Sequence, residues 1–108
     1  MKVSNILVDE DSQVSFEQYD YESSEWKEWM DDGGVLASVV PKAELIEQLN
    51  KWVVDEKAKW DDEEYLSNLD TTHQQLLAEI NAVDESKIVG YGEWGVEYDN
   101  NFCIVVND

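Results

Sequence analysis

The stretch Phe102-Cys103-Ile104-Val105-Val106 decides how this 108-residue chain folds. Its apolar residues in succession predict a strand that is buried on both faces, and such strands usually lie inside a sheet. Cys103 is the only cysteine, so no disulfide can form within one chain. We therefore expect a buried, inert thiol in a reducing cytosol.

The segment before this strand contains closely spaced glycines. Residues 93–98 alternate apolar and polar side chains and predict a strand, and Asp99-Asn100-Asn101 is a hairpin signal. Gly90, Gly92 and Gly95 are expected to divide the region into short strands with a twisted or bulged hairpin edge. Their spacing resembles that of a phosphate-binding loop, but acids and aromatics fill the gaps and the segment precedes no helix.

Three more strands are expected in the first 40 residues. They comprise residues 3–8, 14–21 and 35–40, and the turn between the first two is Asp9-Glu10-Asp11-Ser12.

Four segments are predicted to be helical. They are residues 23–30, 41–60, 61–69 and 71–83. Gly33-Gly34 is expected to end the first, and Pro41 to lie in the first turn of the second. Asp61 and Glu64 have capping-box spacing at the start of the third, and Asp70 is expected to cap the fourth. The clearest is 41–60, because its apolar residues repeat at helical spacing. Its apolar stripe consists of Leu45, Leu49, Trp52, Val53 and Trp60.

Charged residues on the 41–60 helix have the spacing of ion pairs. Glu47 precedes Lys51 by four positions, and Asp55 precedes Lys59 by four, which is the favourable order. Together, the predicted elements give an α+β fold: a mainly antiparallel β-sheet with two or three helices packed on one side, in a single domain of residues 1–108.

Charge is the extreme feature of the composition. The chain carries 26 Asp and Glu against 7 Lys, has no Arg, and has a net charge of −19. Such a charge raises the free energy of the compact state through self-repulsion. The 5 Trp, 5 Tyr and 2 Phe argue against a disordered acidic tail. We therefore expect a folded domain surrounded by negative potential.

The acidity is patterned along the chain. Residues 1–34 carry a net charge of −8, residues 35–60 carry 0, and residues 61–108 carry −11. The longest predicted helix is thus neutral, with acidic segments on both sides of it. Solubility requires a charge of only about 2–8 in a small domain, so −19 indicates a use for the field beyond a solvated surface.

The sequence makes a poor case for catalysis, and we expect a non-enzyme without cofactor or metal. His73 is the only histidine and lies on the apolar side of a predicted helix, which favours a hydrogen-bonded structural role. There is no Cys pair for zinc. Residues 9–13 alternate oxygen ligands as a calcium loop does, but they lack the Gly at the sixth position and the Glu at the twelfth.

The acidic clusters have spacings that could imitate the charges of a nucleic acid. Acids three or four apart on a helix, or two apart on a strand, lie about 5–7 Å apart, similar to successive phosphates. Trp and Tyr beside such acids could anchor a partner that the carboxylates steer. The predicted partner-binding residues are Glu22, Glu25, Glu28, Asp31, Asp32, Asp61, Asp62, Glu63, Glu64, Asp84, Glu85, Glu93, Glu97, Trp26 and Trp94.

These features favour a non-enzymatic inhibitor that mimics DNA. Its partner would be a basic nucleic-acid-binding protein, such as a nuclease or a restriction or CRISPR effector, as in phage-encoded counter-defence (anti-restriction or anti-CRISPR type). Nucleic acid and anionic membranes would repel the chain, so we expect no direct binding to either. The N-terminus opens no signal peptide, which predicts a cytoplasmic location.

Two alternatives stay open. The first is a cytosolic immunity protein against a basic nuclease toxin, which would use the same electrostatics on a partner of different origin. The second is an acidic structural or calcium-binding interaction module. The sequence also leaves open whether the chain forms a homodimer, which would lengthen the mimic.

Overall fold

Strand β5 (Asn100–Asn107) lies at the centre of a five-stranded antiparallel sheet, as the FCIVV stretch predicts. The computed structural model describes residues 2–21, 27–84, 88–94 and 100–107. The strand order is β2-β1-β5-β4-β3. The remaining strands are β1 (Lys2–Val8), β2 (Val14–Asp20), β3 (Gly34–Val39) and β4 (Ile88–Trp94).

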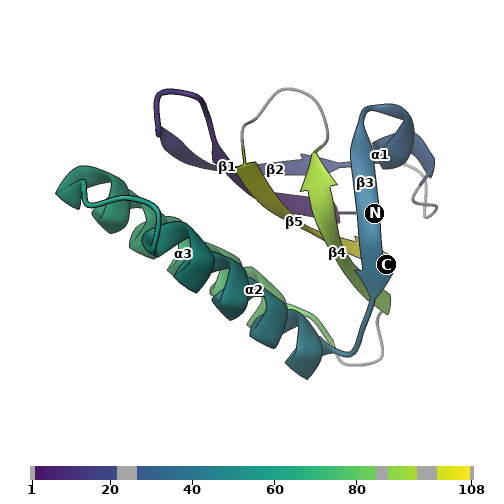
Figure 1. Ribbon diagram of the computed structural model, residues 1–108. Coiled ribbons are helices and arrows are strands. Elements are labelled where there is room, and N and C mark those ends of the chain that lie inside the picture. Colours follow the sequence, from purple (N-terminus) through teal and green to yellow (C-terminus); the bar gives the residue numbers. More distant parts are fainter. Residues whose placement is uncertain (1, 22–26, 85–87, 95–99, 108) are drawn as a thin grey trace.

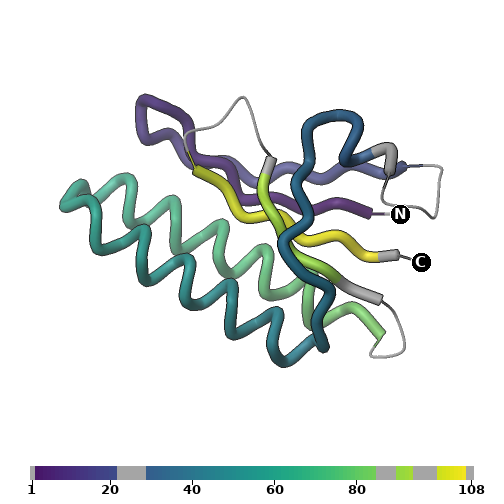
Figure 2. Tube along the Cα trace, turned by 45° about the vertical axis from the view of Figure 1, so that its right-hand side comes forward, coloured from purple at the N-terminus to yellow at the C-terminus, as the bar shows by residue number. Residues whose placement is uncertain are grey.

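Two long helices cover one face of this sheet (Figure 1), which confirms the predicted α+β class. They are α2 (Lys42–Lys57) and α3 (Glu63–Ala82), which run antiparallel as a hairpin (Figure 2). Leu45, Leu49 and Val53 of α2 are buried against the sheet, as the predicted stripe requires. Each such side chain stabilises the fold by about 1.5–3 kcal/mol relative to exposure.

The two faces of β5 bury different sets of side chains because residues alternate along a strand. Phe102 and Ile104 pack in the core beneath α2 and α3. Cys103 and Val105 point to the opposite face, where they pack with Trp29 of the short helix α1 (Lys27–Asp31). Trp29 is fully buried, so it belongs to the core and contributes nothing to a partner surface.

One predicted helix boundary is wrong. Residues 61–69 and 71–83 were expected to be separate helices, but α3 is continuous from Glu63 to Ala82. Asp70 does not cap a helix, because its carboxylate forms an ion pair with Lys57 of α2 and is satisfied inside the helix. The cap of α3 is Asp62, whose side chain accepts from the Tyr65 backbone N–H at 3.0 Å.

Three smaller expectations also need correction. Pro41 precedes α2 as its N-cap and does not lie in the first turn. Trp60 lies beyond the end of α2, is 47% exposed and contacts the Tyr65 ring at a centroid distance of 6.0 Å. Strand β4 continues through Gly90 and Gly92, because strand pairing on both sides holds the backbone extended. The parts of the predicted elements over residues 22–26 and 95–99 lie outside the described residues.

Gly92 allows β3 and β4 to approach closely. The β3–β4 register shifts between Leu36 and Ser38, and a Cβ atom added at Gly92 would collide with the Val35 carbonyl oxygen. That oxygen belongs to the backbone, so a side-chain rotation cannot relieve the collision. Glycine is therefore required at this position.

We predict that Gly92→Ala lowers the free energy of unfolding by about 1–3 kcal/mol, the usual cost of overpacking. Urea titrations followed by far-UV circular dichroism would measure the loss. Val39→Thr is the matched control, because Val39 is 54% exposed on β3, the edge strand that pairs with β4. That variant should stay within about 0.5 kcal/mol of the wild type. Equal stability of Gly92→Ala and Val39→Thr would contradict the close approach.

Candidate functional site

Two acidic segments that are far apart in the sequence lie at the same end of the molecule. Val8 of β1 pairs with Val14 of β2, so the turn between them projects beyond this end of the sheet. α3 starts at the same end and runs back along β1, and Lys2 at the other end of β1 donates to Glu79 at 3.0 Å. Both views show the β1–β2 turn and the α2–α3 connection on the same side (Figures 1 and 2).

We call this set of carboxylates the acidic end. Its members are Asp9, Glu10, Asp11, Asp61, Asp62, Glu63 and Glu64. All are exposed except Asp9, which is half-buried. Four of them were predicted as site residues, whereas the three in the β1–β2 turn were predicted as a turn and compared with a calcium loop, but not as partner-binding residues.

Local hydrogen bonds hold the acidic end in place. The Asp9 carboxylate accepts from the backbone N–H groups of Asp11 and Gln13, both at 2.9 Å, and thereby closes the β1–β2 turn. Asp62 caps α3, and Glu63 and Glu64 lie in its first turn, where the helix dipole favours negative charge. These interactions offset part of the repulsion that the cluster creates.

The buried carboxylate of Glu56, which was not predicted from the sequence, forms hydrogen bonds on both sides of the α2–α3 connection. Glu56 is 2% exposed and accepts from the Tyr65 hydroxyl at 3.0 Å and from Lys59 at 2.9 Å. Lys59 thus binds Glu56, one position from its predicted partner Asp55. Burial and the bond to Glu56 raise the pKa of the Tyr65 hydroxyl above its usual range. The contacts of Glu56 fix both sides of the segment that carries Asp61 and Asp62.

The other predicted acids do not join the acidic end. Asp31 and Asp32 are exposed where α1 leads into β3, and Glu93 is exposed on β4, so these three lie toward the opposite edge of the sheet. Asp84 follows α3 at the other end of the molecule, near Lys2. The described residues thus divide the predicted surface into separate regions. Glu22, Glu25, Trp26, Glu85 and Glu97, and the side chains of Glu28 and Trp94, lie outside the described part of the structure.

A groove with a volume of about 370 Å³ lies between α2 and the β3–β4 edge. Its wall is aromatic: Phe102 stacks on Tyr91 at 5.8 Å with an interplanar angle of 3°, and Trp52 meets Phe102 at 5.9 Å. The Trp52 indole N–H donates to the Asn100 side-chain oxygen at 3.3 Å. Trp52 packs against the core, as the predicted stripe requires, and its half-buried ring also lines the groove.

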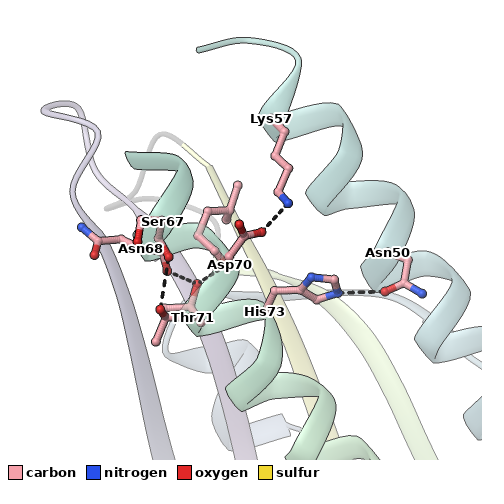
Figure 3. A network of polar contacts seen from close by, with 9 residues as sticks. Asn50, Lys57, Ser67, Asn68, Asp70, Thr71 and His73 are labelled. Atoms are coloured by element: carbon pink, nitrogen blue, oxygen red, sulfur yellow. Dashed lines mark hydrogen bonds and ion pairs between the residues drawn. The ribbon is translucent and has the colours of Figure 1, made fainter. Parts of the chain in front are cut away.

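Polar side chains join α2 to α3 next to the ion pair of Lys57 and Asp70 (Figure 3). His73 lies 2.8 Å from the Asn50 side-chain oxygen, so its ring is hydrogen-bonded as predicted. Burial, followed by the charge of Lys57, lowers the pKa of His73, and Asp70 acts in the opposite direction. The arrangement is a helix–helix contact on the side of α3 that faces α2.

Comparisons with known proteins give no further guide. No protein-family model, curated protein or solved structure matches the chain. Among the described residues, no three His, Cys, Asp or Glu side chains gather closely enough to hold a metal ion. No described helix combines the length and the apolar character needed to cross a membrane.

The Asp62 cap can be tested by Asp62→Ala. We expect this variant to lose about 1 kcal/mol of unfolding free energy, since the Tyr65 N–H loses its acceptor. Asp61→Ala removes the same charge from the neighbouring position and should be neutral or slightly stabilising. Urea denaturation of both variants measures the difference. A larger loss for Asp61→Ala would instead favour the capping box predicted from the sequence.

The lowered pKa of His73 predicts a pH-dependent contribution to stability. Below the ordinary histidine pKa of 6.5 the unfolded chain binds the proton more readily than the folded protein does. The wild type should therefore lose stability relative to His73→Gln as the pH falls from about 7.5 to about 5.5. Urea titrations of both proteins across this pH range give the difference in their free energies of unfolding. The carboxylates titrate in both proteins, so their contribution cancels in that difference. A difference that is constant with pH would contradict the prediction.

Proposed function

We propose that this protein is a non-enzymatic inhibitor that imitates DNA and covers the basic nucleic-acid-binding surface of a partner protein. Suitable partners are nucleases and restriction or CRISPR effectors, whose channels attract phosphates. The observation that carries the proposal is the acidic end, where exposed carboxylates from the β1–β2 turn and the α2–α3 connection lie on the same side of the fold.

The strength and position of the charge support this function. A net charge of −19 creates a field that accelerates association with a basic surface. The longest dimension of the molecule is 39 Å, which equals the rise of about eleven base pairs of duplex DNA. A partner groove that accommodates one turn of DNA could therefore accept the domain lengthwise.

Rigidity also supports the proposal, because an imitation of a charge lattice requires fixed carboxylates. The Asp9 turn bonds, the Asp62 cap and the buried Glu56 each restrain backbone next to an exposed acid. The backbone next to these acids is thus already ordered before the partner binds, so that binding loses less conformational entropy there.

The test compares two variants with the same loss of negative charge. Asp61→Asn/Glu63→Gln/Glu64→Gln removes three of the seven charges of the acidic end and spares the Asp62 cap. Its control, Asp20→Asn/Glu44→Gln/Glu47→Gln, neutralises exposed acids on β2 and α2. Each tagged protein is incubated with bacterial lysate at about 0.15 M salt and then challenged with duplex DNA or with about 1 M salt.

We expect the wild type and the control to capture a DNA-binding protein that duplex DNA and high salt both release. The acidic-end variant should lose this capture, because the field at the contact is weakened there. Equal capture by both variants would contradict the role of the acidic end. A partner that DNA does not displace would contradict mimicry and favour recognition of another surface, as in an immunity protein.

A further inference from the structure

We propose that the groove between α2 and the β3–β4 edge receives an arginine side chain of the basic partner. The identity of the partner as a basic protein rests on the proposed function. The affinity of the groove for a cation follows from its aromatic rings and carboxylates, whichever partner carries that cation.

The groove offers aromatic surface to a ligand. Phe102 lines the groove and is 4% exposed, and two rings contact it: Tyr91 is stacked on it and Trp52 is tilted against it. The bond from the Trp52 indole to Asn100 holds that ring in position. Tyr91 and Trp52 are only half-buried, so part of each ring lies open to the groove. Trp and Tyr faces attract cations placed within about 6 Å.

A carboxylate accompanies each of these two rings. Asp55 follows Trp52 by three positions on α2, and Glu93 follows Tyr91 by two positions on the same side of β4, so both line the groove and both are exposed. A cation stacked on either ring would therefore have an acidic acceptor on the same wall. This pairing of ring and carboxylate on both α2 and β4 suits a cationic ligand.

The charge balance of the groove agrees with that choice. Lys51 also lines it, four positions before Asp55, so that the described lining residues carry one positive and two negative charges. The lining is therefore net negative, and Asp55 and Glu93 supply an acceptor on each wall for an incoming cation.

Charge disfavours a nucleotide, because its phosphates would face Asp55 and Glu93, and shape favours arginine over lysine. The volume of about 370 Å³ lies within the range of ligand sites and accommodates a long side chain. Val35 and Ala37 of β3 offer apolar surface for its methylene stem. A guanidinium stacks flat on aromatic rings and binds a carboxylate through two N–H groups, whereas an ammonium does neither as well.

Nuclear magnetic resonance of the intact protein tests the site directly. N-acetyl-arginine amide is titrated while the indole N–H signal of Trp52, identified with Trp52→Phe, is followed. We expect a saturable shift of that signal. In Asp55→Asn/Glu93→Gln the affinity should fall by about tenfold. Glu44→Gln/Glu47→Gln, which removes equal charge from α2 outside the groove, should bind as the wild type does.

Control compounds separate the sources of binding. N-acetyl-lysine amide should bind more weakly, and N-acetyl-norleucine amide should leave the signal unchanged. Equal shifts with the arginine and norleucine amides would overturn the proposal in favour of a merely apolar groove. Absence of a saturable shift, or an unaltered affinity in Asp55→Asn/Glu93→Gln, would also overturn it.

The acidic-end variant keeps the two proposals distinguishable. Asp61→Asn/Glu63→Gln/Glu64→Gln should bind N-acetyl-arginine amide with wild-type affinity, because its altered residues do not line the groove. Arginine binding without DNA-competed capture would refute the DNA mimic but leave the arginine site intact. DNA-competed capture without arginine binding would refute only the site.

Discussion

Burial of β5 on both faces is the constraint on which the rest of the structure depends. Phe102 and Ile104 require cover on one side, which α2 and α3 supply, and Cys103 and Val105 require it on the other, where Trp29 packs. A strand enclosed in this way leaves little room for charge in the interior. The acids are therefore displaced to the turns, the outer helix surfaces and the strand ends. The α2–α3 connection and the β1–β2 turn, which are both acidic, lie at the same end of the molecule.

The neutral middle of the sequence has a structural explanation. Residues 35–60 form β3 and α2, and the lysines near the end of α2 meet acids across and along the helices: Lys57 pairs with Asp70 of α3, and Lys59 pairs with Glu56. An exposed pair contributes at most about 1 kcal/mol. The larger effect of these lysines is to place positive charge beside α3. Repulsion between carboxylates is therefore reduced at the α2–α3 interface and persists at the acidic end.

The sequence predicted the sheet well, because the alternation of Val14 and Phe16 with polar neighbours in β2, the turn between β1 and β2, and the doubly apolar β5 are local patterns. The division of α3 at Asp70 was wrong for an identifiable reason. An Asp before two Thr residues has the local signature of a cap, but α3 continues through it, since Leu69, Thr72 and Leu76 are buried on either side and Lys57 of α2 pairs with its carboxylate. The distant partner is invisible in the sequence.

The candidate site shows the same division between local and tertiary information. The acids at 61–64 could be found from the sequence because charge clusters are visible there. The contribution of the β1–β2 turn, the buried Glu56 and the groove beside Trp52 depend on how α2, α3 and β4 come together. Trp52 in particular has helical spacing typical of core, and only its position at the margin of the sheet exposes its ring.

The two outer strands of the sheet differ in a way that gives the acidity a second role. β2 carries Glu17 and Asp20, whereas β3, with the sequence GVLASV, has no charged residue, and Val35 and Val39 are 49% and 54% exposed. An uncharged outer strand can template pairing with another chain. In this protein, long-range electrostatic repulsion opposes such pairing, since two copies that each carry a net charge of −19 repel one another before their β3 strands come into contact. Protection of β3 from aggregation therefore comes from the charge of the whole surface, because β3 itself carries no charged residue that would oppose strand pairing.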